Sequence, residues 1–441
     1  MPGRAGARMT IADMTTAPPR RGAQQPVTRP PALGTDGRPW ARRLPLTLSA
    51  VAVVMLPVTV PRGPGNLGPA DLFIVLAIAA WLFSAVADGQ RMRFPYALSI
   101  GLLMAGGAIG GLAGPLPDAA LLAVVQDLVL LAWCWTLVNV CGTPGRADVM
   151  LKAWVYGAVT WACVLFVGLA AGLPALTGQI ATEGSRTALT FGDPNVCANY
   201  FYISLALVWA TARPRRRSLR GLVSVLLIAA MVSTGSNSGL VSLAVGLSGT
   251  FVFATFRRSG LIPALAASAC ILVGAAVCLS TISLHSLQRR AYTSGYAVLR
   301  DGIGRGQASV TERSKVLSES LKLYAEGGPL GEGPVSTKPR MEAAMDPYPK
   351  EAHDDYFAAL LERGIVGAVG LLILITGLLI RTGSLLRRGA GPLGGVIRSP
   401  QALAAGVAGT MTTMAVYELL HVRHVWGLFA IVAIAAGWER R

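Results

Sequence analysis

The chain has 441 residues, of which 53% are hydrophobic and only 14% are charged. Soluble domains carry about a quarter of charged residues, so this composition argues against a soluble protein and indicates an integral membrane protein. The formal net charge is +17. We interpret the excess as the Lys and Arg that cytoplasmic loops collect, and not as a sign of nucleic-acid binding.

The first 43 residues are rich in Pro, Arg and Gly and contain no apolar core. We predict a disordered basic cytoplasmic tail over 1–43, which is too long for the n-region of a cleaved signal peptide. The six cysteines lie mostly in apolar stretches and form no CxxC pair. We expect small apolar side chains there, without disulfides or zinc.

A helix that crosses the bilayer core needs about 20 apolar residues. Twelve segments qualify as candidates, namely 44–61, 69–87, 94–114, 118–140, 149–171, 194–212, 219–234, 237–256, 260–282, 356–380, 400–417 and 424–438. The predicted fold is therefore all-α, a polytopic membrane protein with about twelve transmembrane helices. Nine of them fall in 44–282 and three in 356–441, with a large external loop over 283–355.

Basic residues fall on alternate connections between these segments. With the tail inside, the inside connections hold Arg91, Arg93, Arg146, Lys152, Arg213, Arg215, Arg216, Arg217, Arg220, Arg257, Arg258, Arg381, Arg387, Arg388 and Arg398. The short outside connections hold only Arg62. This alternation predicts that both termini lie in the cytoplasm.

Three further outside segments stand apart: a medium loop over 172–195, a long loop of mixed charge over 283–355 and a short polar segment over 417–424. Within the long loop, "TERSKVLSESLKLYAEGG" (311–328) has apolar residues at helical spacing and ends in two glycines. This pattern predicts a small helical external domain packed on the membrane face. All four histidines, His285, His353, His421 and His424, fall on this side or at its edge.

Arg186 stands in "GSRTALTFGDPNVCANYF" (184–201) and is the only Lys or Arg in 153–212. It lies on the side where topology does not require positive charge, which favours a functional role. Asp193 and Asn195 flank a proline and read as a helix start, with Asp193 at the N-cap. Capping alone remains the alternative to substrate binding for both.

Arg313 heads the external helix, where a cation is slightly unfavourable, and this favours a role other than helix stability. A solvated side chain paired with a nearby glutamate is the alternative. The turn-rich "PLGEGP" (329–334) could bring backbone N–H groups near a ligand.

"HDDYFAALLERGIVGAVG" (353–370) places a histidine and two aspartates directly before an apolar run. Asp354 or Asp355 can cap the helix that starts at Tyr356, while His353 is either an interfacial polar residue or a functional base.

The glycines at 364, 367 and 370 predict close helix packing. Glu362 and Arg363 enter the apolar span early and either pair with neighbours or face a polar cavity. Asp127, within another span, is expected to be a buried pairing partner.

"YELLHVRHVW" (417–426) would place Glu418, His421 and His424 on one face if it were helical. A metal site would need further tight ligands, so we expect a polar rim to a substrate cavity and no metal.

Four elements occur in order between about residues 180 and 430: an Arg before "FGDPN", an Arg heading a helix that ends in "GGPLGEGP", then "HDDYFAALLERGIVG", and a late "HVRHVW". Together they resemble the O-antigen ligase and O-antigen polymerase superfamily of bacterial membranes. Two positions depart from that pattern. Asp354 stands where the family usually has Asn, and Asn237 in "TGSNSG" stands where the family often has Arg.

The resemblance implies a metal-independent, membrane-embedded glycosyltransferase of the C type, without a cofactor, at the outer face of the cytoplasmic membrane. Its donor would be a polyprenyl-diphosphate-linked glycan and its acceptor another glycan. By the same resemblance, Arg186 and Arg313 would hold the diphosphate and His353 would be the general base. Further substrate-site candidates are Tyr356, Glu362, Arg423, Asp193, Asn195, Asp354, Asp355, His421 and His424.

We expect polymerisation of lipid-linked repeat units into cell-surface polysaccharide, with a flippase and a chain-length regulator as candidate partners. Ligase-type transfer to another acceptor remains open. A transporter or flippase is the alternative from another class, but it should carry polar groups through midplane helices. Here polar groups gather outside, with Gln126, Asp127 and Asn139 as the main exceptions.

Overall fold

The computed structural model describes residues 39–61, 63, 67–179, 184–281, 284–296, 300, 315, 318–325, 328–340 and 354–437. Every regular element in these ranges is a helix. The principal helices are α1 (Pro39–Met55), α2 (Pro69–Ala87), α3 (Ala97–Ala113), α4 (Pro117–Val140), α5 (Pro144–Ala171), α6 (Pro174–Thr177), α7 (Pro194–Thr211), α8 (Arg217–Ser233), α9 (Asn237–Ser259), α10 (Leu261–Thr281), α11 (Leu284–Tyr292), α15 (Asp355–Arg388), the 3-10 helix η4 (Gly391–Gly395), α16 (Pro400–Met414) and α17 (Arg423–Gly437).

Each of the twelve predicted spans overlaps one helix. Six helices are long and apolar enough to cross a membrane by length and composition: α2, α4, α5, α9, α10 and α15. The others are shorter, with α3 and α17 among the apolar ones. The predicted all-α, polytopic membrane fold is thus confirmed, while most of the predicted tail, 1–38, lies outside the described residues.

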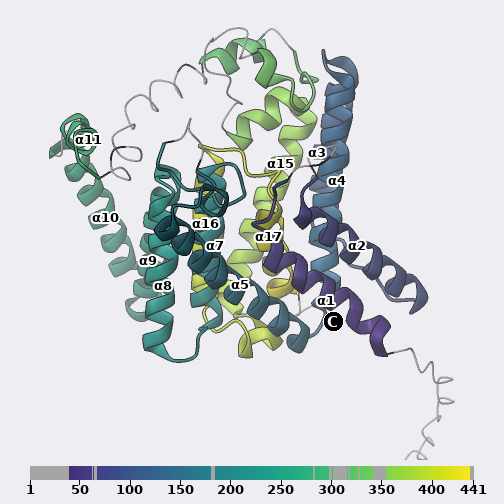
Figure 1. Ribbon diagram of the computed structural model, residues 1–441, viewed down its shortest axis with the longest axis horizontal. Helices are drawn as coiled ribbons and strands as arrows, with labels where there is room; N and C mark the ends of the chain where they lie inside the picture. The colour runs from purple at the N-terminus through teal and green to yellow at the C-terminus, as the bar shows by residue number, and fades with distance from the viewer. Residues whose placement is uncertain are drawn as a thin grey trace, which may run out of the picture. The chain divides into compact units, whose positions relative to one another are not determined.

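Burial separates the inner helices from the outer ones. Nearly every residue of α7 and α17 is buried, and in Figure 1 both lie within the bundle while α10 lies at its edge. Large apolar side chains are exposed on the outer helices, such as Phe83 of α2 (70%) and Leu272 of α10 (70%). In a membrane protein such surfaces face lipid, where exposure of apolar groups costs nothing.

Hydrogen bonds and ion pairs join the connections between helices at each end of the bundle. At one end of the bundle, the backbone N–H of Thr59 donates to Thr190 Oγ1 at 3.0 Å, and Thr187 and Ser233 share a hydroxyl bond of 2.9 Å. These residues belong to connections that the charge pattern places together outside.

The other end joins connections that the charge pattern places inside. The N–H of Arg398 donates to the carbonyl of Ala210 at 2.7 Å, and Asp148 pairs with Arg213. The alternation of the helices therefore agrees with the alternation of the basic residues.

Helices α3 and α15 pack closely along small residues. A Cβ added at Gly106 would lie 2.6 Å from the backbone N of Gly367, and one added at Gly370 would lie 2.7 Å from the carbonyl oxygen of Ser99. Neither distance leaves room for a side chain, so the predicted glycine stripe does bring two backbones together.

Helix α15 is broken at Gly364, where the sequence predicts an uninterrupted helix over 356–380. This residue has φ 62° and ψ −167°, a region essentially restricted to glycine. Gly364 is buried, so the backbone groups that the break frees must find hydrogen-bond partners in the protein.

The segment 329–334 supplies those partners. Pro329 accepts from the N–H of Ile365 at 2.9 Å, and the N–H groups of Glu332 and Gly333 donate to the carbonyls of Leu361 and Glu362 at 3.0 and 2.9 Å. Two N–H groups of "PLGEGP" therefore bond to α15, where the sequence suggested that they serve a ligand.

Arg363, next to the break, pairs with Asp127 of α4 at 2.6 Å, and both side chains are largely buried. This confirms Asp127 as a buried pairing partner. The external segment contributes a short helix over 318–325, whose Leu323 and Tyr324 pack against Ala358 and Leu361 of α15. The predicted contact of the external loop with the membrane helices thus exists over the described part.

Two glycines of α3 provide a matched test of the α3–α15 packing. Gly106→Ala should lower the free energy of unfolding by about 1–3 kcal/mol, because the methyl group has no space against α15. Gly101, on the same helix, has no atom within 4 Å of an added Cβ, so Gly101→Ala should be neutral or slightly stabilising. Thermal unfolding in detergent measures both, and equal effects of the two substitutions would contradict the close packing.

Candidate functional site

Arg186 is held between the end of α8 and the start of α7. Its Nε donates to the carbonyl of Thr234 at 2.9 Å, and its Nη2 lies 3.5 Å from the side-chain oxygen of Asn195. Thr234 is the C-cap of α8, two residues before the N-cap of α9, and Asn195 is the second residue of α7. The half-buried guanidinium is therefore fixed from two sides at the end of the bundle that the charge pattern assigns to the outside.

Helix α7 starts as the sequence predicts. Asp193 is the N-cap, and its Oδ1 accepts from the N–H groups of Asn195 and Val196 at 2.6 and 3.3 Å. Pro194 occupies the first helical position, where its missing N–H costs nothing. The Asp193 carboxylate is thus engaged in capping, while Asn195 points its amide oxygen toward α9.

Two serines that the sequence reasoning did not select complete this cluster. Ser236 Oγ donates to Asn195 Oδ1 at 2.8 Å and lies 2.9 Å from Ser238 Oγ, while it also caps α9 by accepting from the N–H of Gly239 at 3.2 Å. The "TGSNSG" stretch was the available signal. It places the α9 start beside Arg186, with Asn237 between the two serines.

This arrangement suits an anion. Helix N-termini carry partial positive charge, and two of them meet here beside a guanidinium. Hydroxyl and amide groups surround the same point. A diphosphate is the kind of ligand that such a set binds, because arginine can hold its oxygens bidentately and stays charged.

The start of α15 assigns separate tasks to the two aspartates. Asp354 is the N-cap, and its Oδ1 accepts from the N–H groups of Tyr356 and Phe357 at 2.7 and 3.3 Å. Burial raises the pKa of the Asp354 carboxyl above its ordinary value. Asp355 is only 3% exposed and accepts from the N–H of Leu419 at 2.7 Å, which fastens the α16–α17 connection to α15.

Helix α16 links the α15 start to α9. Tyr356 donates its hydroxyl to the carbonyl of Met411 at 3.1 Å, and Ser242 of α9 donates to the carbonyl of Gly409 at 2.7 Å. Ser242 follows Ser236 by six residues, or about 9 Å along a helix. The start of α15 and the Arg186 cluster therefore lie at the same end of the bundle.

His353 and Arg313 lie outside the described residues, and so do the side-chain contacts of His285. In the sequence, His353 directly precedes the cap Asp354.

Glu362 is buried and accepts a hydrogen bond from the hydroxyl of Thr337. It therefore connects the external segment to α15 beside the break at Gly364. The predicted substrate-site candidate Glu362 therefore has a structural partner in the external segment.

The late polar segment differs from the expected helical face. Residues 415–422 are not helical, so Glu418, His421 and His424 do not share one helix face. His424 lies in α17 with no exposed surface, bonded through Nε2 to the side-chain oxygen of Asn199 at 3.1 Å. His424 therefore lies in the interior of the bundle and not at a polar rim, because it is the second residue of the buried apolar helix α17.

Arg423 pairs with Asp71 near the start of α2, donating from Nε and Nη2 to both carboxylate oxygens. Asp71 also accepts from the N–H of Gly68 at 2.7 Å. The predicted substrate contact therefore has a protein partner, and this pair ties α17 to α2. Within the described residues, no three His, Cys, Asp or Glu side chains are grouped as metal ligands.

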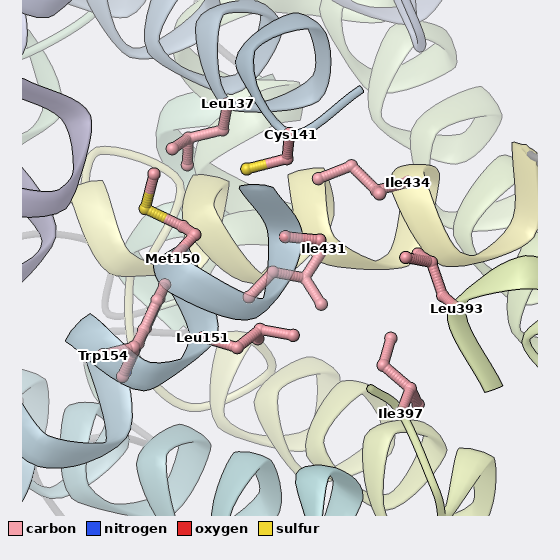
Figure 2. Close-up of a pocket in the computed structure, with 10 residues that line it drawn as sticks. Leu137, Cys141, Met150, Leu151, Trp154, Leu393, Ile397, Ile431 and Ile434 are labelled. Atoms are coloured by element: carbon pink, nitrogen blue, oxygen red, sulfur yellow. The ribbon is translucent and has the colours of Figure 1, made fainter. Parts of the chain in front are cut away.

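An apolar cavity lies elsewhere, between α4, α5, η4 and α17. Figure 2 shows its lining of aliphatic side chains with Cys141, Met150 and Trp154. Its volume is about 10 Å³, which holds no more than a water-sized group. It offers no acid, base or arginine for catalysis.

Comparison with known proteins agrees with the motifs. Residues 222–372 match the family model described as O-antigen ligase, and this range runs from α8 through the external segment into α15. The matched range includes Ser236, Ser238 and the "HDDY" motif. It begins after Arg186 and ends before Arg423. A search of curated proteins gives no match to the chain. With its apolar all-helical fold, the chain is a polytopic membrane protein in which residues 222–372 are similar to an O-antigen ligase domain, and this supports the resemblance to the O-antigen ligase and polymerase superfamily.

Proposed function

We propose that the protein joins polyprenyl-diphosphate-linked repeat units into a cell-surface polysaccharide at the outer face of a bacterial cytoplasmic membrane. The observation that carries the proposal is the fixed position of Arg186 between the α8–α9 connection and the start of α7. A preorganised guanidinium at two positive helix ends is suited to the charge that develops on a departing diphosphate. The family match supports the same class of reaction.

In the proposed reaction, an acceptor hydroxyl attacks the anomeric carbon of the donor glycan. The bond from that carbon to the diphosphate oxygen breaks, and polyprenyl diphosphate leaves with the electron pair. His353 takes the hydroxyl proton, because a neutral imidazole with an ordinary pKa of about 6.5 is ready to accept one at neutral pH. Arg186 and Arg313 stabilise the leaving group.

The proposed orientation follows from charge. Basic residues gather at the end of the bundle opposite Arg186, as Arg213 and Arg398 show. Cytoplasmic connections collect such residues, which favours both termini inside and the Arg186 end outside. The lipid tail would lie along the apolar outer helices while diphosphate and sugars project from the membrane.

Ligase-type transfer uses the same donor chemistry with a different acceptor and remains the alternative. A flippase is less well supported. Asp127 pairs with Arg363, and the Asn139 side chain bonds to the backbone of Arg93 at 2.8 Å. Both intramembrane polar groups thus have structural partners, whereas a transport path would need them to face a substrate.

Replacement of Arg186 by lysine should lower the rate of chain extension by about 100-fold or more, because a bidentate fork becomes a point charge. The assay is extension of a lipid-diphosphate repeat unit by purified protein. Arg215→Lys, at an exposed residue of the opposite end, is the matched control and should retain activity. Wild-type activity in the Arg186 variant would remove the diphosphate role.

His353→Ala should abolish polymer while expression and membrane insertion stay normal, because the acceptor hydroxyl loses its base. Asp354→Asn is the neighbouring control. Asparagine caps helices as well as aspartate does and is the residue that the family usually has there, so activity should persist. Polymer of normal length from His353→Ala would sink the assignment.

The same control has a stability readout. Because burial raises the pKa of Asp354, the free energy of unfolding of the wild type falls as the pH rises through the titration of this carboxyl. The asparagine side chain of the Asp354→Asn variant does not titrate, so the fall should be smaller in the variant than in the wild type. Unfolding curves at acidic and neutral pH measure the difference.

A further inference from the structure

A second cavity, of about 320 Å³, lies at the end of the bundle opposite Arg186. It is formed where α3 begins, α4 and α17 end, and α15 passes on its way to Arg388. Arg93 and Arg381 contribute its charge, while Phe94, Val138 and Ile434 contribute apolar walls. It adjoins the small cavity of Figure 2 through Cys141 and Ile434, which line both.

Both arginines are held in place. The N–H of Arg93 donates to Asn139 Oδ1 at 2.8 Å, and its carbonyl accepts from Asn139 Nδ2 at 2.8 Å, so α4 fixes this point of the chain. The guanidinium of Arg381 lies over the ring of Tyr96, 5.1 Å from its centroid. The backbone of Arg93 and the guanidinium of Arg381 are therefore positioned by the surrounding helices.

Among the described residues, the cavity contains no counter-charge for its arginines. None of its lining residues is acidic, and in the part of the chain that the structure describes no Asp or Glu pairs with Arg93 or Arg381. Two half-buried arginines of like charge line one cavity, and an anion bound there would offset their mutual repulsion. A phosphate suits this geometry best, because guanidinium groups bind its oxygens in pairs.

The apolar walls distinguish a lipid from a free ion. The volume is at the lower end of the roughly 300–1,000 Å³ typical of small-molecule sites, which accommodates a head group. Phe94 is 47% exposed at the margin, next to the outer surface of the bundle. Basic pockets between transmembrane helices on the cytoplasmic side are suited to anionic head groups.

We propose that this cavity binds the phosphate head group of an anionic membrane lipid, with Arg93 and Arg381 on the phosphate and the acyl chains along the adjoining apolar surface. The site is separate from the proposed transferase site and lies at the other end of the bundle. Its ligand would join α3, α4, α15 and α17, and α3 and α15 are the pair that encloses the break at Gly364. Binding can be measured without activity, so the outcome does not depend on the proposed reaction.

The test uses the delipidated full-length protein in neutral detergent and its thermal unfolding midpoint. Phosphatidylglycerol should raise the midpoint, while phosphatidylcholine and inorganic phosphate at the same concentration should not. Arg93→Gln with Arg381→Gln should weaken the apparent affinity for phosphatidylglycerol by about tenfold or more, as expected for the loss of charged hydrogen bonds.

The matched control is Arg91→Gln with Arg387→Gln. Arg91 precedes α3 as Arg93 does, and Arg387 lies in α15 as Arg381 does; both are exposed and neither lines the cavity. This variant therefore loses the same charge as the cavity variant and should bind phosphatidylglycerol as the wild type does. If the cavity variant unfolds on purification, Arg93→Gln alone tests the site and leaves the Arg381–Tyr96 contact intact; it should also weaken binding.

Three results would overturn the proposal. An equal loss of affinity for phosphatidylglycerol in both double variants would mean that the lipid is attracted to a basic surface in general. Unchanged affinity in the cavity variant, or in Arg93→Gln, would mean that the arginines do not hold the ligand. Stabilisation by inorganic phosphate equal to that by phosphatidylglycerol would mean a free-phosphate site and not a lipid site.

Discussion

Within a membrane, backbone groups that leave a helix must be satisfied by the protein itself, and the break of α15 at Gly364 creates that demand. The segment 329–334 meets it with three backbone hydrogen bonds to α15. The external segment is therefore fastened to the same helix whose first turn carries Asp354 and Tyr356. Ten residues, or about 15 Å of helix, separate the cap Asp354 from the break.

The surroundings of the break explain why it is tolerated. Close packing of Gly106 against Gly367 brings α3 beside α15, and the Arg363–Asp127 pair joins α15 to α4. A buried charge pair of this kind is costly to break, because removal of one partner leaves the other charge without compensation. Together these contacts place the rigid part of α15 between the external segment and the opposite end of the bundle, where Arg381 lies.

Local features were predictable from the sequence. The spans followed from runs of apolar residues, their alternation from Lys and Arg, and the caps Asp193 and Asp354 from residue preference. Features that depend on distant partners were not. Arg423 pairs with Asp71, 352 residues away, and Ser236 joins Asn195 across two helix starts. The burial of His424 and the break at Gly364 likewise depend on what packs around them, which spacing alone does not encode.

The central claim is transfer of a glycan from a lipid diphosphate. The most direct measurement is the amount of polyprenyl diphosphate released for each glycosidic bond formed, with purified protein in liposomes and a defined lipid-linked repeat unit. The account predicts a ladder of longer glycans and equal amounts of released diphosphate and new bonds. Movement of the intact repeat unit across the bilayer with neither product would contradict it.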